Sequence, residues 1–234
     1  MSWKEEAKKK AALKSVALVQ GNDVVGLGTG STTRYMVEEL GRRVKEEGLH
    51  ITGVPTSIHT SRLAKKVGIP LTNLDEHPRL DIAIDGADQV DPRLNLIKGM
   101  GGALTREKIV DSAAERLVII VDESKLTEKL GENQVVPVEV IPLGLTPVIT
   151  QLEELGGTSV TRRIGDADYF ITDNGNYIVD VDFGVIDNPT RLEREIKLIP
   201  GVVENGLFID MTEVVYVGSE REVKTIERHE GVAG

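Results

Sequence analysis

The stretch VVGLGTGSTTRYMVEEL, residues 24–40, decides the fold class that this chain can adopt. An apolar run leads into a turn rich in glycine and hydroxyl residues, and a segment with apolar residues at helical spacing follows. A strand that passes through such a turn into a helix offers backbone N–H groups and the positive end of the helix dipole to an anion. The turn therefore predicts a βα unit that holds a negatively charged group, unless its hydroxyls serve only as ordinary helix caps.

The same alternation of strand and helix continues on both sides of the turn, from about residue 16 to residue 122. Amphipathic segments separate short apolar runs, which read DVVGLG, HITGVPTS, LDIAIDGAD and RLVIIVD. Strands that alternate with helices in this way form parallel sheets with right-handed crossovers. The first half of the chain therefore predicts a Rossmann-like, doubly wound sheet.

The rhythm changes near Gly131. The segments QVVPVEVIP, LTPVITQLEEL, TSVTRRI, YFITDNGNYIVDV with its Asn-Gly turn, NPTRLEREIKLI and VVENGLFI follow in the order β-α-β-β-α-β. That order is typical of a ferredoxin-like unit, and EVVYVG then adds a strand that could return to the first sheet. We predict an α/β protein in which a Rossmann-like domain, residues 1–130 and 207–234, is interrupted by an inserted ferredoxin-like α+β domain, residues 131–206.

Composition limits the classes of partner. Of the 234 residues, 38 are acidic and 28 basic, which gives a net charge of −10, and only 3% are aromatic. Such a chain has little to gain from counterion release on nucleic acid and little to stack on bases. Cysteine is absent, and no run approaches the roughly 20 apolar residues that span a bilayer. We therefore expect a cytoplasmic protein with no nucleic-acid partner and no membrane partner.

Two familiar nucleotide loops do not fit the glycine turn. A P-loop needs a lysine after its glycines, and none follows here. A dinucleotide fingerprint needs a third glycine, where Ser31 or Thr33 stands, and an acid after the second strand, where Thr56 and Ser57 stand. The turn at residues 28–32 suits a single phosphate of a small molecule instead.

Charged residues follow the next strands at their carboxyl ends, where open α/β sheets bind ligands. Asp85 and Asp88 follow the apolar run that begins at Leu80, although Asp-Gly is also ordinary turn chemistry. No acidic or histidine motif has the spacing of metal ligands, so we expect neither a metal nor another cofactor.

A second glycine-rich turn, KGMGG, begins at Lys98 and leads into a helix expected from about Thr105, with Glu107 in its first turn. Lys125 follows the next strand in the same manner. Taken singly, Lys98 could be a solvated surface charge. Glu107 could be an acid that complements the helix dipole and stabilises the helix by under about 1 kcal/mol. Taken together, the carboxylates and lysines suit proton transfer next to a carbonyl, with a cation that stabilises the developing oxyanion.

With these residues in place, the sequence resembles the ribose-5-phosphate isomerase A family over essentially its whole length. The matching motifs are GLGTGST at 26–32, DGAD at 85–88, KGMGGALTREK at 98–108, ESK at 123–125, PVEVIP at 137–142 and TDNGN at 172–176. The resemblance implies interconversion of D-ribose 5-phosphate and D-ribulose 5-phosphate without a metal, by a homodimer or homotetramer. Oligomer contacts are expected from the inserted domain.

The resemblance also implies roles for individual residues. Glu107 matches the base that moves a proton between C2 and C1 through a cis-enediol(ate), Lys98 the lysine that stabilises the enediolate oxygen, and Asp85 the residue that assists ring opening. The matching substrate-binding positions are Thr29, Gly30, Ser31, Thr32, Asp85, Gly86, Ala87, Asp88, Lys98, Gly99, Met100, Gly101 and Lys125.

Two positions depart from the family pattern, and other functions compete with it. Met100 replaces a common glycine, which predicts a changed pocket wall, and Gln89 replaces a common glutamate, which puts one supporting contact in doubt. A non-enzymatic sugar-phosphate sensor on the same fold is the main alternative. It would need an effector module, and no helix-turn-helix pattern fits the short N-terminal segment. An aminosugar-phosphate deaminase or a lactonase would keep the phosphate turn, but the KGMGGALTREK stretch disfavours both.

Overall fold

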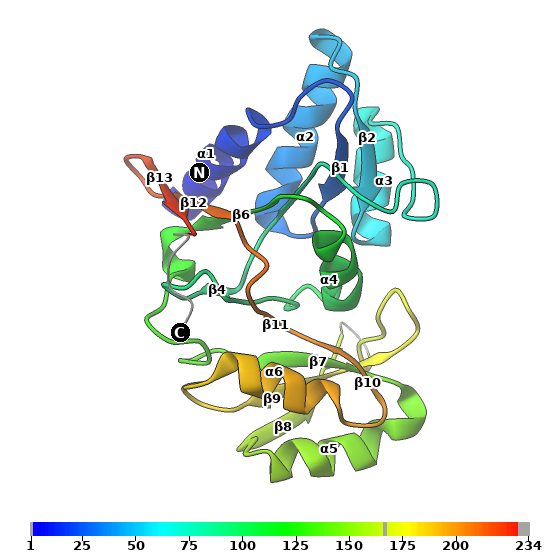
Figure 1. Cartoon of the computed structure of the whole chain (residues 1–234), viewed down its shortest axis with the longest axis vertical. Helices are drawn as coiled ribbons and strands as arrows, with labels where there is room; N and C mark the ends of the chain where they lie inside the picture. The colour runs from blue at the N-terminus through cyan, green and yellow to red at the C-terminus, as the bar shows by residue number, and fades with distance from the viewer. Residues whose placement is uncertain (1, 166–167, 229–234) are drawn as a thin grey trace. The chain divides into compact units, whose positions relative to one another are not determined.

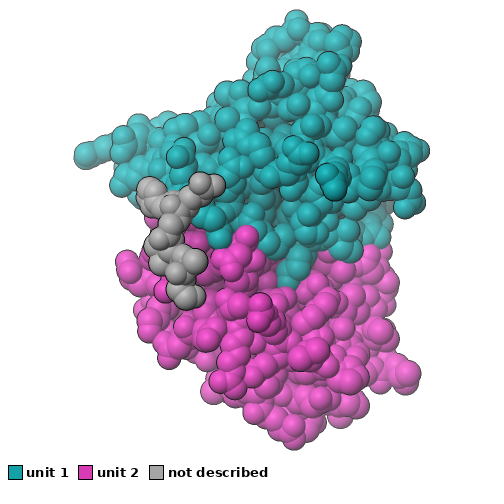
Figure 2. All heavy atoms as spheres, in the orientation of Figure 1, with its two compact units in different colours: residues 1–86, 106–125, 211–234 teal, residues 87–105, 126–210 magenta. Residues whose placement is uncertain are grey.

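The computed structural model describes residues 2–165 and 168–228. It has two compact units: residues 1–86, 106–125 and 211–234 form the first, and residues 87–105 and 126–210 form the second (Figure 2). The predicted division into residues 1–130 with 207–234 and an inserted domain at 131–206 stays a prediction. Within this predicted division, residues 1, 166–167 and 229–234 lie outside the part of the chain that the structure describes.

The first unit contains a mostly parallel sheet, as the sequence predicted. Its strand order is β13-β12-β6-β3-β1-β2, and only the β12–β13 pair is antiparallel. The strands are β1 Val24–Leu27, β2 Thr52–Pro55, β3 Ile82–Asp85, β6 Leu117–Asp122, β12 Val214–Gly218 and β13 Val223–Glu227. The segment EVVYVG, as β12, does return to this sheet.

Helices cover both faces of this sheet. The helices are α1 Trp3–Val16, α2 Ser31–Glu46, α3 Ile58–Val67 and α4 Leu104–Ser112, and the turn η1 Glu123–Lys125 follows β6 (Figure 1). Alternate strand residues such as Ile82 and Ile84 pack with buried residues of α1, α2 and α3. On the opposite face, Val110 of α4 packs with Val54 and Leu80. This arrangement is the doubly wound one, and it places α4 over the face to which Ala83 and Asp85 point.

The second unit contains the predicted ferredoxin-like arrangement. Its elements are β7 Val136–Val140, η2 Pro142–Gly144, α5 Leu145–Glu154, β8 Ser159–Arg162, β9 Tyr177–Asp182, α6 Pro189–Lys197 and β10 Val202–Asn205. The strands pair antiparallel in the order β10-β7-β9-β8. Val136, Val138 and Val140 of β7 pack with apolar residues of α5 and α6. The order β-α-β-β-α-β read from the sequence is confirmed.

Two details of this unit differ from the prediction. The segment VVENGLFI is not one strand, because the chain breaks at Gly206 into β10 and β11 Leu207–Phe208. A side chain at Gly206 would place its Cβ 2.4 Å from the Lys98 carbonyl oxygen, so only glycine permits this close approach. In the TDNGN hairpin the Asn-Gly turn forms, but the arm before it is reduced to isolated bridges at Tyr169 and Ile171.

The break at Gly206 creates a small sheet that the sequence did not predict. Here β11 pairs antiparallel with β5 Leu96–Ile97, which in turn pairs with β4 Gln89–Val90. Strands of two residues are too short to show a period in the sequence. Lys98 directly follows β5, so the pairing of β5 in this sheet fixes the backbone that leads to Lys98.

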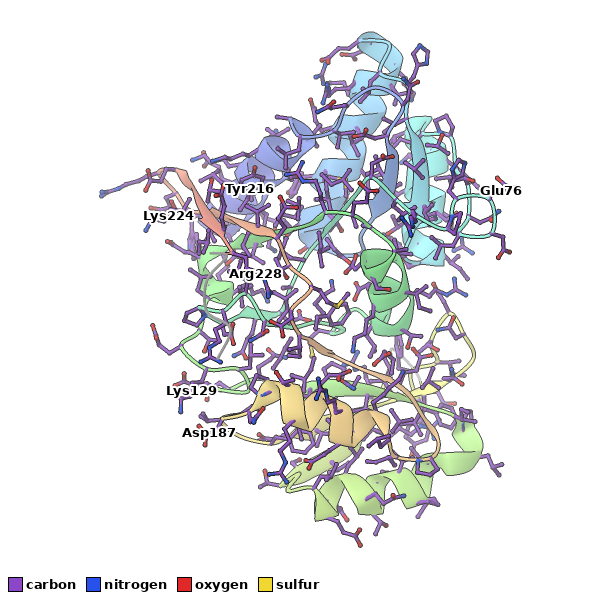
Figure 3. The ribbon with its side chains drawn as sticks, viewed as in Figure 1. Glu76, Lys129, Asp187, Tyr216, Lys224 and Arg228 are labelled. Atoms are coloured by element: carbon purple, nitrogen blue, oxygen red, sulfur yellow. The ribbon has the colours of Figure 1, made fainter. Side chains whose placement is uncertain are left out.

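Two contacts within the second unit hold the segment between η1 and β7, residues 126–135. Gln89 donates its amide to the Glu132 carbonyl at 2.7 Å and accepts from the Gly131 N–H at 2.9 Å. Lys129 forms an exposed ion pair with Asp187 at 2.7 Å, which lowers the pKa of Asp187, and both residues are labelled in Figure 3. Gln89, which stands where glutamate is common in the family, thus donates a hydrogen bond to the Glu132 carbonyl that a glutamate carboxylate could not donate.

No helix of residues 2–165 and 168–228 is both long and apolar enough to cross a bilayer.

Candidate active site

The glycine turn of the first unit is built around Asp85. This aspartate is the last residue of β3 and is 0% exposed. Its Oδ1 accepts from the Thr29 N–H at 3.1 Å and from the Gly86 N–H at 2.6 Å. The carboxylate lies where a side chain at Gly28 would stand, because a Cβ there would be 2.2 Å from Oδ1. Glycine at residue 28 is therefore required for Asp85 to occupy this position.

Thr29 is bonded to the protein itself. Its hydroxyl lies within hydrogen-bonding distance of the hydroxyls of Thr56 at 2.7 Å, Ser57 at 2.8 Å and Thr60 at 3.0 Å. The two hydroxyl residues that replace an acid after the second strand thus brace the turn. Contact of Thr29 with a substrate stays a prediction.

The N-terminus of α2 lies at the outer part of the turn. Gly30 is its N-cap and makes no side-chain capping hydrogen bond, and Gly30 and Ser31 are exposed while Thr32 is half-buried. The hydroxyls of the turn are therefore not ordinary caps of this helix. The first N–H groups of α2 and these hydroxyls suit an anion.

Lys8 of α1 contacts this turn, and sequence reasoning missed it. Its Nζ lies 3.1 Å from the Ser31 Oγ and 3.1 Å from the Glu5 Oε1. The Tyr35 hydroxyl donates to Glu5 at 2.5 Å, and this hydrogen bond, together with the one from Lys8, lowers the pKa of Glu5. Lys8 thus places a cation from α1 beside Ser31, whereas a P-loop carries its lysine after its glycines. Nothing in the sequence singles Lys8 out from the other lysines of that helix.

Glu107 lies in the first turn of α4, as predicted, and is only 3% exposed. A solvated acid that merely complements the helix dipole would not be buried in this way. Val110, one turn further along, lies against β1 and β3, since a Cβ at Gly26 would meet its side chain at 2.9 Å and that of Ala83 at 2.8 Å. Because residues three apart share a helix face, Glu107 and Val110 lie on the same side of α4.

Lys98 of the second unit is also buried, at 2% exposure, so it is not a solvated surface charge. Its N–H donates to the Gly206 carbonyl at 2.9 Å, and its Nζ lies 5.3 Å from the centre of the Phe208 ring. Burying an ammonium group is costly, and such residues are rare outside functional sites and ion pairs.

The KGMGG loop contacts the DGAD segment within the second unit. The Met100 N–H donates to the Asp88 Oδ2 at 3.0 Å, and the Asp88 N–H donates to the Ile97 carbonyl at 2.8 Å. Met100 is 44% exposed, and the changed pocket wall expected at this position stays a prediction.

The remaining predicted positions vary in exposure. Gly99 is buried, Gly101 is exposed, and Gly86, Ala87, Asp88 and Lys125 are half-buried. Lys125 ends η1 in the first unit. The structure thus brings Asp85 together with Thr29 and Gly86 in the first unit, and Asp88 together with Met100 in the second.

Glu139 is a second residue that sequence reasoning left without a role. It lies in β7 and is 0% exposed. Its Oε2 accepts from the Thr105 hydroxyl at 2.5 Å, and its Oε1 accepts from Thr172 at 2.9 Å, Asn174 at 3.1 Å and Asn176 at 2.8 Å. The PVEVIP and TDNGN motifs therefore meet at one carboxylate, which also holds the start of α4. A lone acid in an otherwise apolar strand is the signal that could have identified it.

Among the described residues, no group of three or more histidine, cysteine, aspartate or glutamate side chains could hold a metal ion.

The chain is similar to known proteins of a single family. The family model described as ribose 5-phosphate isomerase A (phosphoriboisomerase A) matches residues 52–222. The ribose-5-phosphate isomerase A of Methanothermobacter thermautotrophicus is 52% identical over 220 residues, which are 94% of this chain and 96% of the relative.

Two solved structures are similar over almost the whole fold. A D-ribose-5-phosphate isomerase in complex with phospho-erythronic acid is 44% identical, with a TM-score of 0.94 over 97% of this chain and 100% of the other. The ribose 5-phosphate isomerase A of Methanocaldococcus jannaschii is 50% identical, with a TM-score of 0.92 over 95% of this chain and 99% of the other. By sequence and by fold, this chain belongs to the ribose 5-phosphate isomerase A family.

Proposed function

We propose that Glu107, Lys98 and Asp85 carry the reaction of this chain, an isomerase that interconverts D-ribose 5-phosphate and D-ribulose 5-phosphate. The observation that supports these three residues is their burial, at 3%, 2% and 0% exposure. Charged side chains are seldom enclosed to this degree without a partner or a functional reason. The alternative of a non-enzymatic sensor is not supported, because relatives near 50% identity are isomerases.

In the proposed reaction, Glu107 removes the proton from C2 of the open-chain aldose. The electron pair of the broken C–H bond forms the C1–C2 double bond, and the carbonyl electrons move to the oxygen on C1. Lys98 stabilises the negative oxygen of this cis-enediolate. Asp85 assists ring opening and the transfer of hydroxyl protons, and Glu107 returns its proton to C1 to give the ketose.

The phosphate of the substrate is assigned to the α2 N-terminus. Gly30, Ser31 and Thr32 supply backbone and hydroxyl donors, and Lys8, at 3.1 Å from Ser31, supplies the positive charge. The remaining contacts with the sugar are assigned to Thr29, Asp85, Gly86, Ala87, Asp88, Lys98, Gly99, Met100, Gly101 and Lys125. Phospho-erythronic acid, bound to one relative, is a sugar-acid phosphate with a planar carboxylate that resembles an enediolate.

The direct test is an assay of the purified protein with D-ribose 5-phosphate, in which ribulose 5-phosphate is measured with and without extensive chelation. We expect turnover in both cases, within about twofold of each other, because the proton transfer is assigned to protein carboxylates and not to a metal-bound water. Binding of the sugar phosphate without turnover would favour the sensor. A large loss that a divalent ion restores would contradict the metal-free mechanism.

Removal of the Lys8 charge should weaken substrate binding. We expect Lys8→Met to raise KM about tenfold or more, because a hydrogen bond to a charged group contributes about 1.5–3 kcal/mol, and to change kcat little. Lys9→Met, at an exposed neighbour on the same helix, is the matched control and should match the wild type. Steady-state kinetics of the three proteins would decide this, and an unchanged KM for Lys8→Met would remove Lys8 from the phosphate site.

We further propose that the protein acts in the cytoplasm as a homodimer or homotetramer, with residues 131–206 in the subunit contacts. Sedimentation equilibrium of the purified protein would give the subunit number.

A further inference from the structure

One nearly buried ion pair of the second unit holds the loop of residues 98–102. Arg163 follows β8, and its Nε donates to the Asp180 Oδ2 on β9 at 2.7 Å, while Nη2 pairs with Oδ1. The two side chains are only 10% and 15% exposed. The Arg163 N–H also donates to the Ile178 carbonyl at 2.8 Å. The paired guanidinium is therefore fixed by the antiparallel sheet, with its second terminal nitrogen left for other contacts.

That nitrogen reaches the backbone of the loop. Nη1 of Arg163 donates to the carbonyl of Gly99 at 2.8 Å and to that of Met100 at 3.1 Å. Gly99 has a φ of +104°, and its carbonyl also accepts from the Gly102 N–H at 2.9 Å, so the loop is a tight turn. The carbonyl and the N–H of one trans peptide point in opposite directions. By holding the two carbonyls, Arg163 sets the directions of the N–H groups of Met100 and Gly101.

The N–H groups of Met100 and Gly101 have different surroundings. The Met100 N–H donates to the Asp88 Oδ2 at 3.0 Å, and so orients a carboxylate assigned to the substrate. Gly101 is exposed, and nothing lies within 4 Å of the position of a Cβ there. An exposed residue three positions from the buried Lys98 leaves room for a sugar phosphate beside the loop.

We propose that Arg163, held by Asp180, is a positioning residue of the isomerase: it fixes the peptide planes of residues 99–101 so that the loop binds the substrate. This inference rests on the proposed function. If Arg163 has this role, the antiparallel sheet that carries Arg163 and Asp180 supports the substrate-binding loop, in addition to any contribution to subunit contacts. Asp180 acts only through Arg163, because its carboxylate holds the guanidinium and not the loop.

The test is the Arg163→Lys variant. A lysine keeps the charge, but its single nitrogen cannot pair with Asp180 as a fork and also hold both carbonyls. We expect kcat/KM to fall about 10–100-fold, through both a raised KM and a lowered kcat, because a displacement of about 1 Å at a binding loop can cost that much. The affinity for phospho-erythronic acid, measured by calorimetry, should fall in parallel with the rise in KM.

Arg162→Lys is the matched control. Arg162 is the adjacent arginine, and its guanidinium stacks 3.5 Å and 3.4 Å from the ring centres of Tyr169 and Tyr177 rather than on the loop. The Arg162→Lys variant should therefore keep wild-type kinetics. Asp180→Asn should show a smaller loss than Arg163→Lys, and the double variant should be no worse than Arg163→Lys alone, because the two residues act in series.

Several outcomes would overturn the inference, and they differ from failure of the proposed function. Wild-type kinetics for Arg163→Lys would do so, and so would equal losses in Arg162→Lys and Arg163→Lys, which would indicate a general effect on the fold. If Arg163→Lys does not fold, wild-type kinetics for Asp180→Asn would have the same force. An inactive wild-type protein would instead contradict the proposed function.

Discussion

Replacement of Glu107 by glutamine should lower kcat by roughly 10²- to 10⁴-fold and leave the fold intact. An amide has nearly the same shape as a carboxylate, but it cannot accept the proton that must leave C2. The cost to the helix dipole should be under about 1 kcal/mol. Binding of phospho-erythronic acid should stay near that of the wild type, because a ligand with a carboxylate in place of the aldehyde is not isomerised and its binding needs no proton transfer.

The informative measurement for Glu107 is the exchange of the C2 hydrogen of the substrate with deuterium from the solvent. We expect rapid exchange in the wild type and very slow exchange in Glu107→Gln. Glu6→Gln is a suitable control, because Glu6 is an exposed acid in the first turn of α1 and its loss has the same effect on a helix dipole. If Glu107→Gln exchanges at a near wild-type rate, Glu107 is only a helix-end acid, and Asp85 becomes the candidate base.

Replacement of Glu139 by methionine should destabilise the second unit by at least about 3 kcal/mol. The change keeps the length of the side chain but removes the acceptor of four buried or part-buried donors, from Thr105, Thr172, Asn174 and Asn176. Each buried donor left without an acceptor costs about 1–3 kcal/mol. The methionine itself recovers only part of this loss by packing.

Urea denaturation, followed by circular dichroism, would measure the effect of Glu139→Met. Glu139→Gln keeps one acceptor oxygen and should lose less stability. Glu153→Met, at an exposed position of α5, should stay within about 0.5 kcal/mol of the wild type. A Glu139→Met protein as stable as the wild type would show that the four hydrogen bonds contribute nothing net.

The sequence predicted the long-range order of the fold because its signals are local and repeated. Strand and helix periods alternate cleanly through the first half, and the β-α-β-β-α-β order of the second unit was visible in the same way. The first turn of α4 was also predictable, because Glu107 follows a glycine-rich turn and precedes helical spacing. Glycine turns and strand ends were enough to identify Asp85 and Lys98 as candidates.

What the sequence could not predict depends on contacts between distant segments. The contact of Lys8 with Ser31 joins two helices, and many lysines of α1 look alike in the sequence. The hydrogen bonds from Arg163 to the carbonyls of Gly99 and Met100 have no local signature in the sequence, because they join residues more than sixty positions apart. The break at Gly206 was missed because a single glycine in an apolar run can mark a bend or can only weaken a continuous strand, and the sequence does not distinguish the two.

The position of β12 has a consequence for the nascent chain. In the finished sheet β6 lies between β3 and β12, and every residue of β6 is buried. The ribosome synthesises β6 before residues 126–210, and it synthesises β12 only after them. The edge of β6 that pairs with β12 in the finished sheet is therefore unpaired while residues 126–210 are made. Open apolar strand edges pair with other chains. Until β12 pairs with it, this edge of β6 is therefore exposed to pairing with other chains.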